Sequence, residues 1–206
     1  MTGAGDRHDL AGHTTDSFRA LLEAGRPVVA LVPVGSVEPH GPHLSLLADV
    51  VISAGACARA AALLDGRGVA AVVAPAVAYG VTDCAAGFAG AASIPAGVLT
   101  SYLRAVIDGL RATGCAHVCL VNNHLEPAHD AAVRAAVQGL APSAASVACP
   151  LTRRWARTLS DEFKSGACHA GRYETSIIMA AGPEFVVEEL RTRLPAVPIK
   201  IGRAHV

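Results

Sequence analysis

Residues 34–49 read Val-Gly-Ser-Val-Glu-Pro-His-Gly-Pro-His-Leu-Ser-Leu-Leu-Ala-Asp, and they join an apolar run to a helical pattern. The apolar run, residues 28–34, has the composition of a strand that is buried on both faces of a sheet. The alanine-rich pattern at 46–64 predicts a helix. We therefore expect the loop between them at the carboxyl end of a strand, where open α/β sheets place their ligand sites.

Strand-like and helix-like segments alternate along the rest of the chain. Further buried strands are expected at 69–77, 118–121 and 146–151, and helices at 18–24, 98–113, 128–140, 153–164 and 174–181. This alternation predicts an α/β fold in which helices cover both faces of a mostly parallel sheet.

Length and composition predict a single globular domain spanning residues 1–206, with residues 1–13 as a loose N-terminal arm. Of the 206 residues, 52% are hydrophobic, and 17 basic residues balance 17 acidic ones. No basic block stands out, so neither nucleic acid nor a membrane surface is an expected partner. The start of the chain lacks a signal-peptide pattern, and the six cysteines form no Cys-x-x-Cys pair, so a cytoplasmic protein with free thiols is expected.

Chemistry-bearing side chains gather in two loops that each follow a predicted strand. Glu38, His40 and Asp49 lie in the first loop, and His124 and Glu126 in the second. In a parallel sheet both loops lie at the same edge, so these side chains are expected to converge. Two imidazoles and three carboxylates suit one or two divalent cations such as Zn, Mn or Fe, and the charge balance favours two.

Each half of this pattern also has a simpler structural explanation. A lone His-x-Glu is usually an exposed pair on a loop, and short motifs of this kind often occur by chance. It is the presence of both sets after buried strands that favours a metal site. His129 is expected to be solvated on the next helix, with support of a metal ligand as the alternative.

Three segments, in this order, resemble the motifs of the creatininase (creatinine amidohydrolase) family. Residues 35–44, Gly-Ser-Val-Glu-Pro-His-Gly-Pro-His-Leu, together with Asp49 are similar to the first metal motif. Residues 122–126, Asn-Asn-His-Leu-Glu, resemble the second, where many members carry Asn-Gly-His-Gly-Gly-Asn and creatininase itself has His-x-Glu. Residues 169–176, His-Ala-Gly-Arg-Tyr-Glu-Thr-Ser, resemble the third.

The resemblance implies a three-layer αβα sandwich and a metal-dependent hydrolase of small amides, often assembled as a hexamer. Carried over by position, one cation would be held by Glu38, Asp49 and His124. The other would be held by His40, Asp49 and Glu126, with Asp49 shared. By the same resemblance, His169 is the catalytic group that moves a proton to the leaving nitrogen, and Glu174 orients the site or lies near the metal.

The loop at 80–91 departs from the family pattern, since the family histidine of this loop is absent. The resemblance implies that this region faces the substrate, with Tyr79, Thr82, Asp83 and Leu125 lining the site. We therefore expect a substrate that differs from that of the typical member.

The predicted function is hydrolysis of a C–N bond in a small cyclic amide, formamide or peptide-like compound by water that the cations activate. A homo-oligomer is expected, and a hexamer is left open because the chain is shorter than typical members. Two alternatives remain. One is another metal-dependent reaction, such as C–C hydrolysis or ring opening of a keto-sugar. The other is a non-catalytic scaffold derived from the enzyme.

Overall fold

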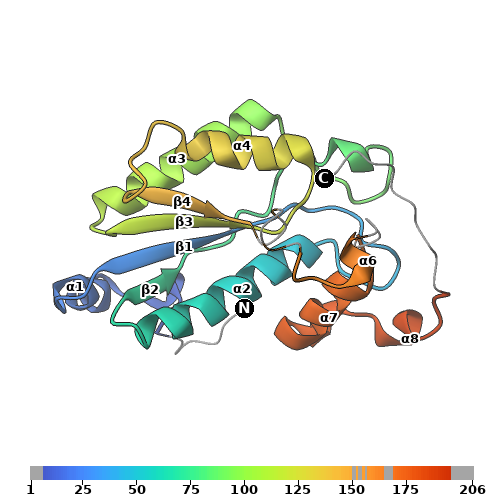
Figure 1. Ribbon diagram of the computed structural model, residues 1–206, viewed down its shortest axis with the longest axis horizontal. Helices are drawn as coiled ribbons and strands as arrows, with labels where there is room; N and C mark the ends of the chain where they lie inside the picture. Colours follow the sequence, from blue (N-terminus) through green and yellow to red (C-terminus); the bar gives the residue numbers. More distant parts are fainter. Residues whose placement is uncertain (1–6, 150–151, 153–154, 156, 165–168, 196–206) are drawn as a thin grey trace.

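The structure is a computed structural model, which describes residues 7–149, 152, 155, 157–164 and 169–195 (Figure 1). Its centre is one four-stranded parallel sheet with the strand order β2-β1-β3-β4. The strands are β1 (Val28–Val34), β2 (Ala70–Val73), β3 (His117–Asn122) and β4 (Ala145–Ala148). The predicted parallel α/β sheet is confirmed, and the first strand has the predicted bounds.

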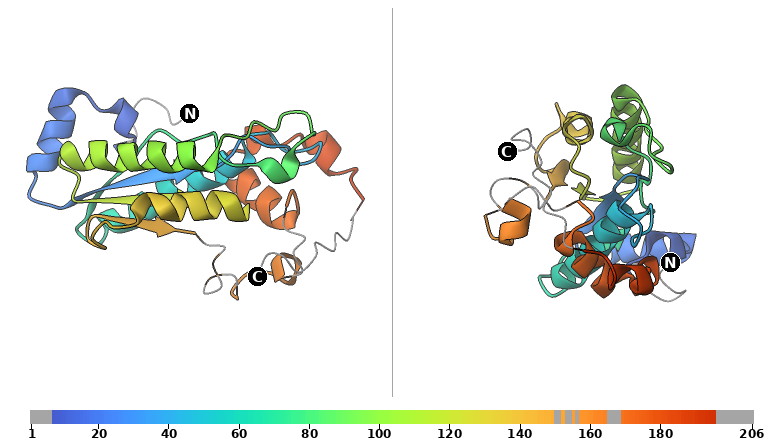
Figure 2. Two further views of the ribbon diagram at one scale, coloured as in Figure 1. Left: turned by 90° about the horizontal axis from the view of Figure 1, so that it is seen from above. Right: turned by 90° about the vertical axis from the view of Figure 1, so that its right-hand side faces the viewer.

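Helices cover both faces of the sheet, which gives three layers (Figures 1 and 2). One face carries α3 (Ala96–Ala112) and α4 (Pro127–Val137), and the other carries α2 (Ala48–Asp65), against which α7 (Arg172–Ala181) packs. The shorter elements are α1 (Thr15–Glu23), α6 (Asp161–Lys164), α8 (Glu188–Arg191) and the 3-10 helices η1 (Leu10–Gly12), η2 (Asp83–Ala85) and η3 (Pro183–Phe185). Among the described helices, none is both long enough and apolar enough to span a bilayer.

The hydrophobic core lies on both sides of β1, as the continuous apolar run predicts. Successive side chains of a strand point to opposite faces. Ala30 and Val32 accordingly belong to the cluster that contains Leu103 of α3, whereas Leu31 packs in the cluster that contains Cys57 of α2. Both layers of helices are therefore held to the same strand by buried apolar surface.

Three expectations differ from the structure. The second strand ends at Val73, before Pro75, because proline lacks the N–H that would continue the ladder. Residues 7–13 are not loose: Asp9 pairs with Val73, whose N–H donates to the carbonyl of His8 at 2.6 Å, so this segment covers the edge of β2. Of the helix expected at 153–164, the structure describes α6, and part of that range lies outside the described residues.

Candidate metal centre

The loops that follow β1 and β3 converge because these strands are neighbours, with Val34 opposite Asn122. The first loop runs into α2 at the same end of the sheet. Gly35 makes this possible, since a Cβ there would lie 2.7 Å from the backbone nitrogen of Val50 and 2.9 Å from the Cβ of Asp49. Only glycine lets the loop approach the first turn of α2 so closely.

This convergence gathers buried imidazole and carboxylate groups into one cluster. Glu38, His40, Asp49 and His124 are each at most 3% exposed. Among the described residues, three sets of potential ligand atoms lie within 4.8 Å of one another: Glu38, Asp49 and His124; His40, Asp49 and Glu174; and Glu38, His40 and His169.

Asp49 lies between two of the histidines. Its Oδ2 is 3.0 Å from His124 Nδ1, and its Oδ1 is 3.4 Å from His40 Nε2. Two atoms that each bind one zinc ion at about 2.1 Å lie roughly 3.0–3.5 Å apart. These distances therefore fit a carboxylate that shares a cation with each histidine, as the resemblance implies for Asp49.

Backbone carbonyls fix the tautomers of both histidines. His124 Nε2 donates to the carbonyl of Val81 at 2.8 Å, so its Nδ1 carries the lone pair in the neutral ring. His40 Nδ1 donates to the carbonyl of Glu38 at 3.2 Å, which leaves the lone pair on Nε2. In each case the lone pair faces the carboxylates, as in histidines whose other nitrogen is held by an outer partner while they bind a metal.

His169 lies over this cluster and is partly open to solvent, with 47% of its side chain exposed. Its Nε2 donates to the carbonyl of Pro39 at 3.0 Å, and its Nδ1 is 3.8 Å from Glu38 Oε1. Its ring stacks on that of His40, with centroids 4.4 Å apart. Burial, together with the charge of His40, lowers the pKa of His169, which favours a neutral ring with a lone pair on Nδ1.

The charges of the cluster suit a divalent cation. Burial acts to lower the pKa of His40 and His124, but the neighbouring Asp49 outweighs it and raises these values to about 9 and about 10. The same contacts hold the pKa of Asp49 below its usual range against burial. Yet neither His40 Nε2 nor Asp49 Oδ2 makes a well-aligned hydrogen bond with another described residue. Buried carboxylates need positive charge beside them, and divalent cations fit these donor atoms better than protons do.

Glu174 joins the cluster from the first turn of α7. Its Oε2 accepts a hydrogen bond from the N–H of Ala170 at 2.6 Å and lies 3.7 Å from His40 Nε2. Burial raises its pKa to about 7. The resemblance implies a place near the metal for this residue, and the structure sets it among the potential ligands.

Glu126 takes a different place from the one expected. Its two carboxylate oxygens accept hydrogen bonds from the N–H groups of Asp83 and Cys84, each at 3.2 Å. It thus holds the start of η2 and belongs to none of the three sets. The structure does not bring together His40, Asp49 and Glu126, and Glu174 completes the set with His40 and Asp49 instead.

The residues expected to line the substrate site divide into two kinds. Thr82 is fully buried and donates its hydroxyl to Glu38 Oε2, so it supports a candidate ligand. Asp83 is exposed and accepts a hydrogen bond from Ser93 at 2.6 Å. Tyr79 and Leu125 are exposed, at 56% and 37%.

His129 differs most from its expectation, because it is fully buried rather than solvated. Its Nδ1 accepts a hydrogen bond from the N–H of Val81 at 3.2 Å, and its ring meets that of His124 edge-on at 4.6 Å. The sequence does contain a signal for this burial. Residues 129, 132, 133 and 136 recur at helical spacing, and all four are buried on one face of α4.

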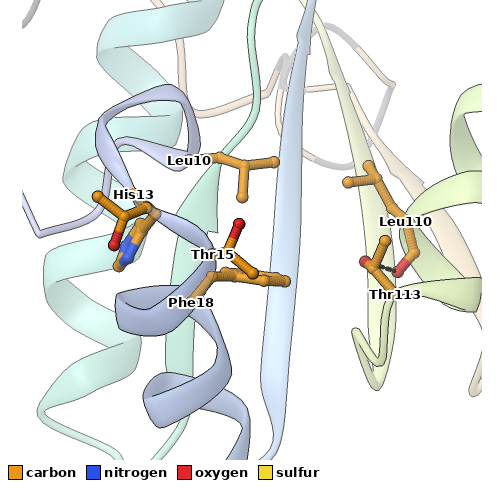
Figure 3. A pocket seen from close by; sticks show the side chains of 7 residues that line it. Leu10, His13, Thr15, Phe18, Leu110 and Thr113 are labelled. Carbon is orange, nitrogen blue, oxygen red and sulfur yellow. Dashed lines mark hydrogen bonds between the residues drawn. The ribbon is translucent and has the colours of Figure 1, made fainter.

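A pocket of about 280 Å³ lies elsewhere, among η1, α1 and the end of α3 (Figure 3). Helix α1 lies at the end of the sheet where β1 begins, whereas α2 starts at the opposite end (Figure 1). The pocket lining includes Leu10, Phe18 and Leu110, and its histidine, His13, already bonds with Ser17 and the carbonyl of Arg7. It offers no reactive group.

Comparison with known proteins identifies a family model and several similar proteins. The family model described as "Creatininase: Creatinine amidohydrolase" matches residues 12–203. A mycofactocin precursor peptide peptidase of Mycolicibacterium smegmatis is 33% identical over 92% of this chain and 72% of its own length. A counterpart in Mycobacterium ulcerans is 30% identical over 94% and 74%. A creatinine amidohydrolase of Pseudomonas putida is 29% identical over 55% and 43%.

Solved structures share the fold. A structure titled as manganese creatininase superposes with a TM-score of 0.72 at 22% identity, covering 88% of this chain and 76% of that one. A mutant creatininase of Zn-Zn type gives 0.68 at 21% identity, covering 87% and 74%.

Proposed function

The chain belongs to the creatininase family of metal-dependent amidohydrolases, and from this premise we propose that it hydrolyses an amide C–N bond at the cluster around Asp49. The observation that carries the proposal is the pairing of buried carboxylates with His40 and His124, each ring fixed by a carbonyl so that its lone pair faces Asp49. Such an arrangement is costly without a cation and favourable with one.

The proposed centre has two neighbouring positions for a divalent cation. Glu38, Asp49 and His124 would hold one, and His40, Asp49 and Glu174 the other, with Asp49 shared. The similar solved structures named for manganese and for a Zn-Zn form support either metal. When bound, such cations lower the pKa of water and polarise the carbonyl under attack.

His169 is the proposed group for proton transfer. Its neutral Nδ1 lies at the partly open side of the cluster and can take a proton from water, while the carbonyl of Pro39 holds the ring in place. The same nitrogen can then give the proton to the leaving amine, which cannot depart as an anion at neutral pH.

We propose a peptide-like amide as the substrate. Four matched relatives are named as mycofactocin precursor peptide peptidases, and they align over most of this chain. The match to a creatinine amidohydrolase covers 55% of the chain and makes a cyclic amide the second candidate.

The test combines metal content with product analysis. Wild-type protein purified without chelator should contain about two equivalents of Mn or Zn per chain, and Asp49→Asn should lose most of it. The loaded protein should release a carboxylate and an amine from a panel of short peptides, N-formyl compounds and cyclic amides. Tight metal binding without release from any of the panel would refute amide hydrolysis, whereas a wild-type protein without metal would refute the centre itself.

A further inference from the structure

We propose that His129 is a positioning residue, which holds the Val81 peptide so that its carbonyl can orient the metal ligand His124. The inference rests on the proposed metal centre. It assigns a role to a buried histidine that supplies no atom to the three sets of potential ligands.

The geometry centres on one residue held at both of its backbone polar groups. The carbonyl of Val81 accepts a hydrogen bond from His124 Nε2 at 2.8 Å, and its N–H donates to His129 Nδ1 at 3.2 Å. The rings of the two histidines meet edge-on at 80°. Val81 is therefore clamped between two side chains that come from the end of β3 and the start of α4.

Gly80 supplies an independent observation. A Cβ at this position would overlap with Nδ1 and Cε1 of the His129 ring and would lie 3.1 Å from the carbonyl oxygen of Gly35. The chain before Val81 thus runs directly against the imidazole, with no room for a side chain. The backbone here is fitted to His129 and not only to the sheet.

The segment that His129 holds supports two of the three members of one ligand set, which consists of Glu38, Asp49 and His124. Val81 orients His124, and the next residue, Thr82, donates its hydroxyl to Glu38. If His129 is replaced by an apolar side chain, the N–H of Val81 is buried without an acceptor, and the segment must shift to satisfy it. A shift of this segment would displace both the Val81 carbonyl that accepts from His124 and the Thr82 hydroxyl that donates to Glu38.

The experiment compares two substitutions at this site by cobalt titration of the metal-free protein. His129→Asn keeps a side-chain acceptor near the position of Nδ1, whereas His129→Leu keeps the bulk and removes the acceptor. We expect His129→Leu to weaken Co²⁺ binding about tenfold and to change its visible absorption spectrum, and His129→Asn to restore both towards wild type. The cobalt spectrum reports the arrangement of ligands, which a loss of stability alone does not alter.

Val133→Ala is the matched control, because Val133 is a fully buried residue of the same helix. It should lower the melting temperature and leave the cobalt affinity and spectrum unchanged. Equal affinity and spectra in wild type, His129→Leu and His129→Asn would overturn the positioning role and leave the metal centre standing. Equal losses in His129→Leu and His129→Asn would likewise overturn it, since the acceptor would then be irrelevant. Absence of cobalt binding by the wild type would overturn both.

Discussion

Asp49 Oδ2 and His124 Nδ1 lie 3.0 Å apart, and both side chains are buried. In the metal-free protein a proton on His124 balances the charge of Asp49. In the loaded protein a cation between the two atoms would take the place of that proton. Metal binding and proton binding therefore compete at this contact.

This competition predicts that the metal-free protein loses stability as the pH rises from about 7 to 9. The pKa values of His40 and His124 are about 9 and about 10 in the folded protein, above the ordinary value of 6.5. A raised pKa stabilises the fold below the ordinary value, and the gain is lost as the pH rises towards the folded value. We expect a loss on the order of 2 kcal/mol, or roughly 4–8 °C in melting temperature.

Calorimetry with chelator across this pH range checks the prediction, and the same scans with excess Mn²⁺ are the control. In the loaded protein the imidazoles are already deprotonated, so the melting temperature should not follow this decline. A metal-free protein with a constant melting temperature from pH 7 to 9 would contradict the pairing of protonated histidines with Asp49.

His169→Ala should separate proton transfer from metal binding. The substitution removes a half-exposed ring that belongs to neither of the two proposed cation positions, so we expect the metal content to stay as in wild type. The turnover rate on any amide that the wild type hydrolyses should fall by about 10²–10⁴-fold, the usual contribution of a general acid–base group. Parallel elemental analysis and initial rates check this, and a mutant that loses its metal would instead place His169 among the ligands.

Thr82→Val should weaken metal binding because it removes the hydroxyl that donates to Glu38. A hydrogen bond to a charged group contributes about 1.5–3 kcal/mol, so we expect an affinity loss of roughly tenfold or more. Thr100→Val is the matched control, since the Thr100 hydroxyl donates to a helix carbonyl of Ala132 away from the cluster. Competition titration with a fluorescent chelator measures both variants, and equal affinities would show that Thr82 does not support Glu38.

Gly80→Ala should destabilise the protein by about 1–3 kcal/mol, since its methyl group would overlap with the His129 ring. Gly109→Ala should have the opposite effect. Gly109 lies inside α3 with open space around its Cβ position, and alanine favours a helix by about 0.5–1 kcal/mol over glycine. Urea unfolding of both variants measures the contrast. Similar changes in the two would show that the backbone at Gly80 is not fitted to His129.

The sequence predicts much of the fold because strands and helices leave local patterns of apolar residues. The apolar run at 28–34 and the parallel pairing of β1 with β3 are enough to bring Glu38, His40, Asp49 and His124 to one edge. The assignment of the chain to the family, and the parallel α/β fold that it implies, are confirmed by the family model and by the similar structures.

Whether Glu126 or Glu174 joins the cluster with His40 and Asp49 depends on long-range packing and not on the local sequence. Glu126 follows His124 closely in sequence, yet its carboxylate binds the N–H groups of η2, whose place depends on the path of the whole 78–95 loop. Glu174 reaches His40 only because α7 packs against α2. His129 was predictable, since its spacing to the buried residues of α4 places it on the inner face.

Because His124 and His129 both hydrogen-bond to Val81, the loop that the resemblance places at the substrate also supports the proposed metal ligands. The loop at 80–91, which departs from the family pattern, supplies the hydrogen bonds of Val81 and Thr82 to His124 and Glu38. A mutation that reshapes this segment for a new amide would therefore also change how firmly the cation is held. Laboratory evolution of this protein should be screened at more than one metal concentration, because variants with an improved substrate loop would otherwise be discarded as inactive when they merely lack metal.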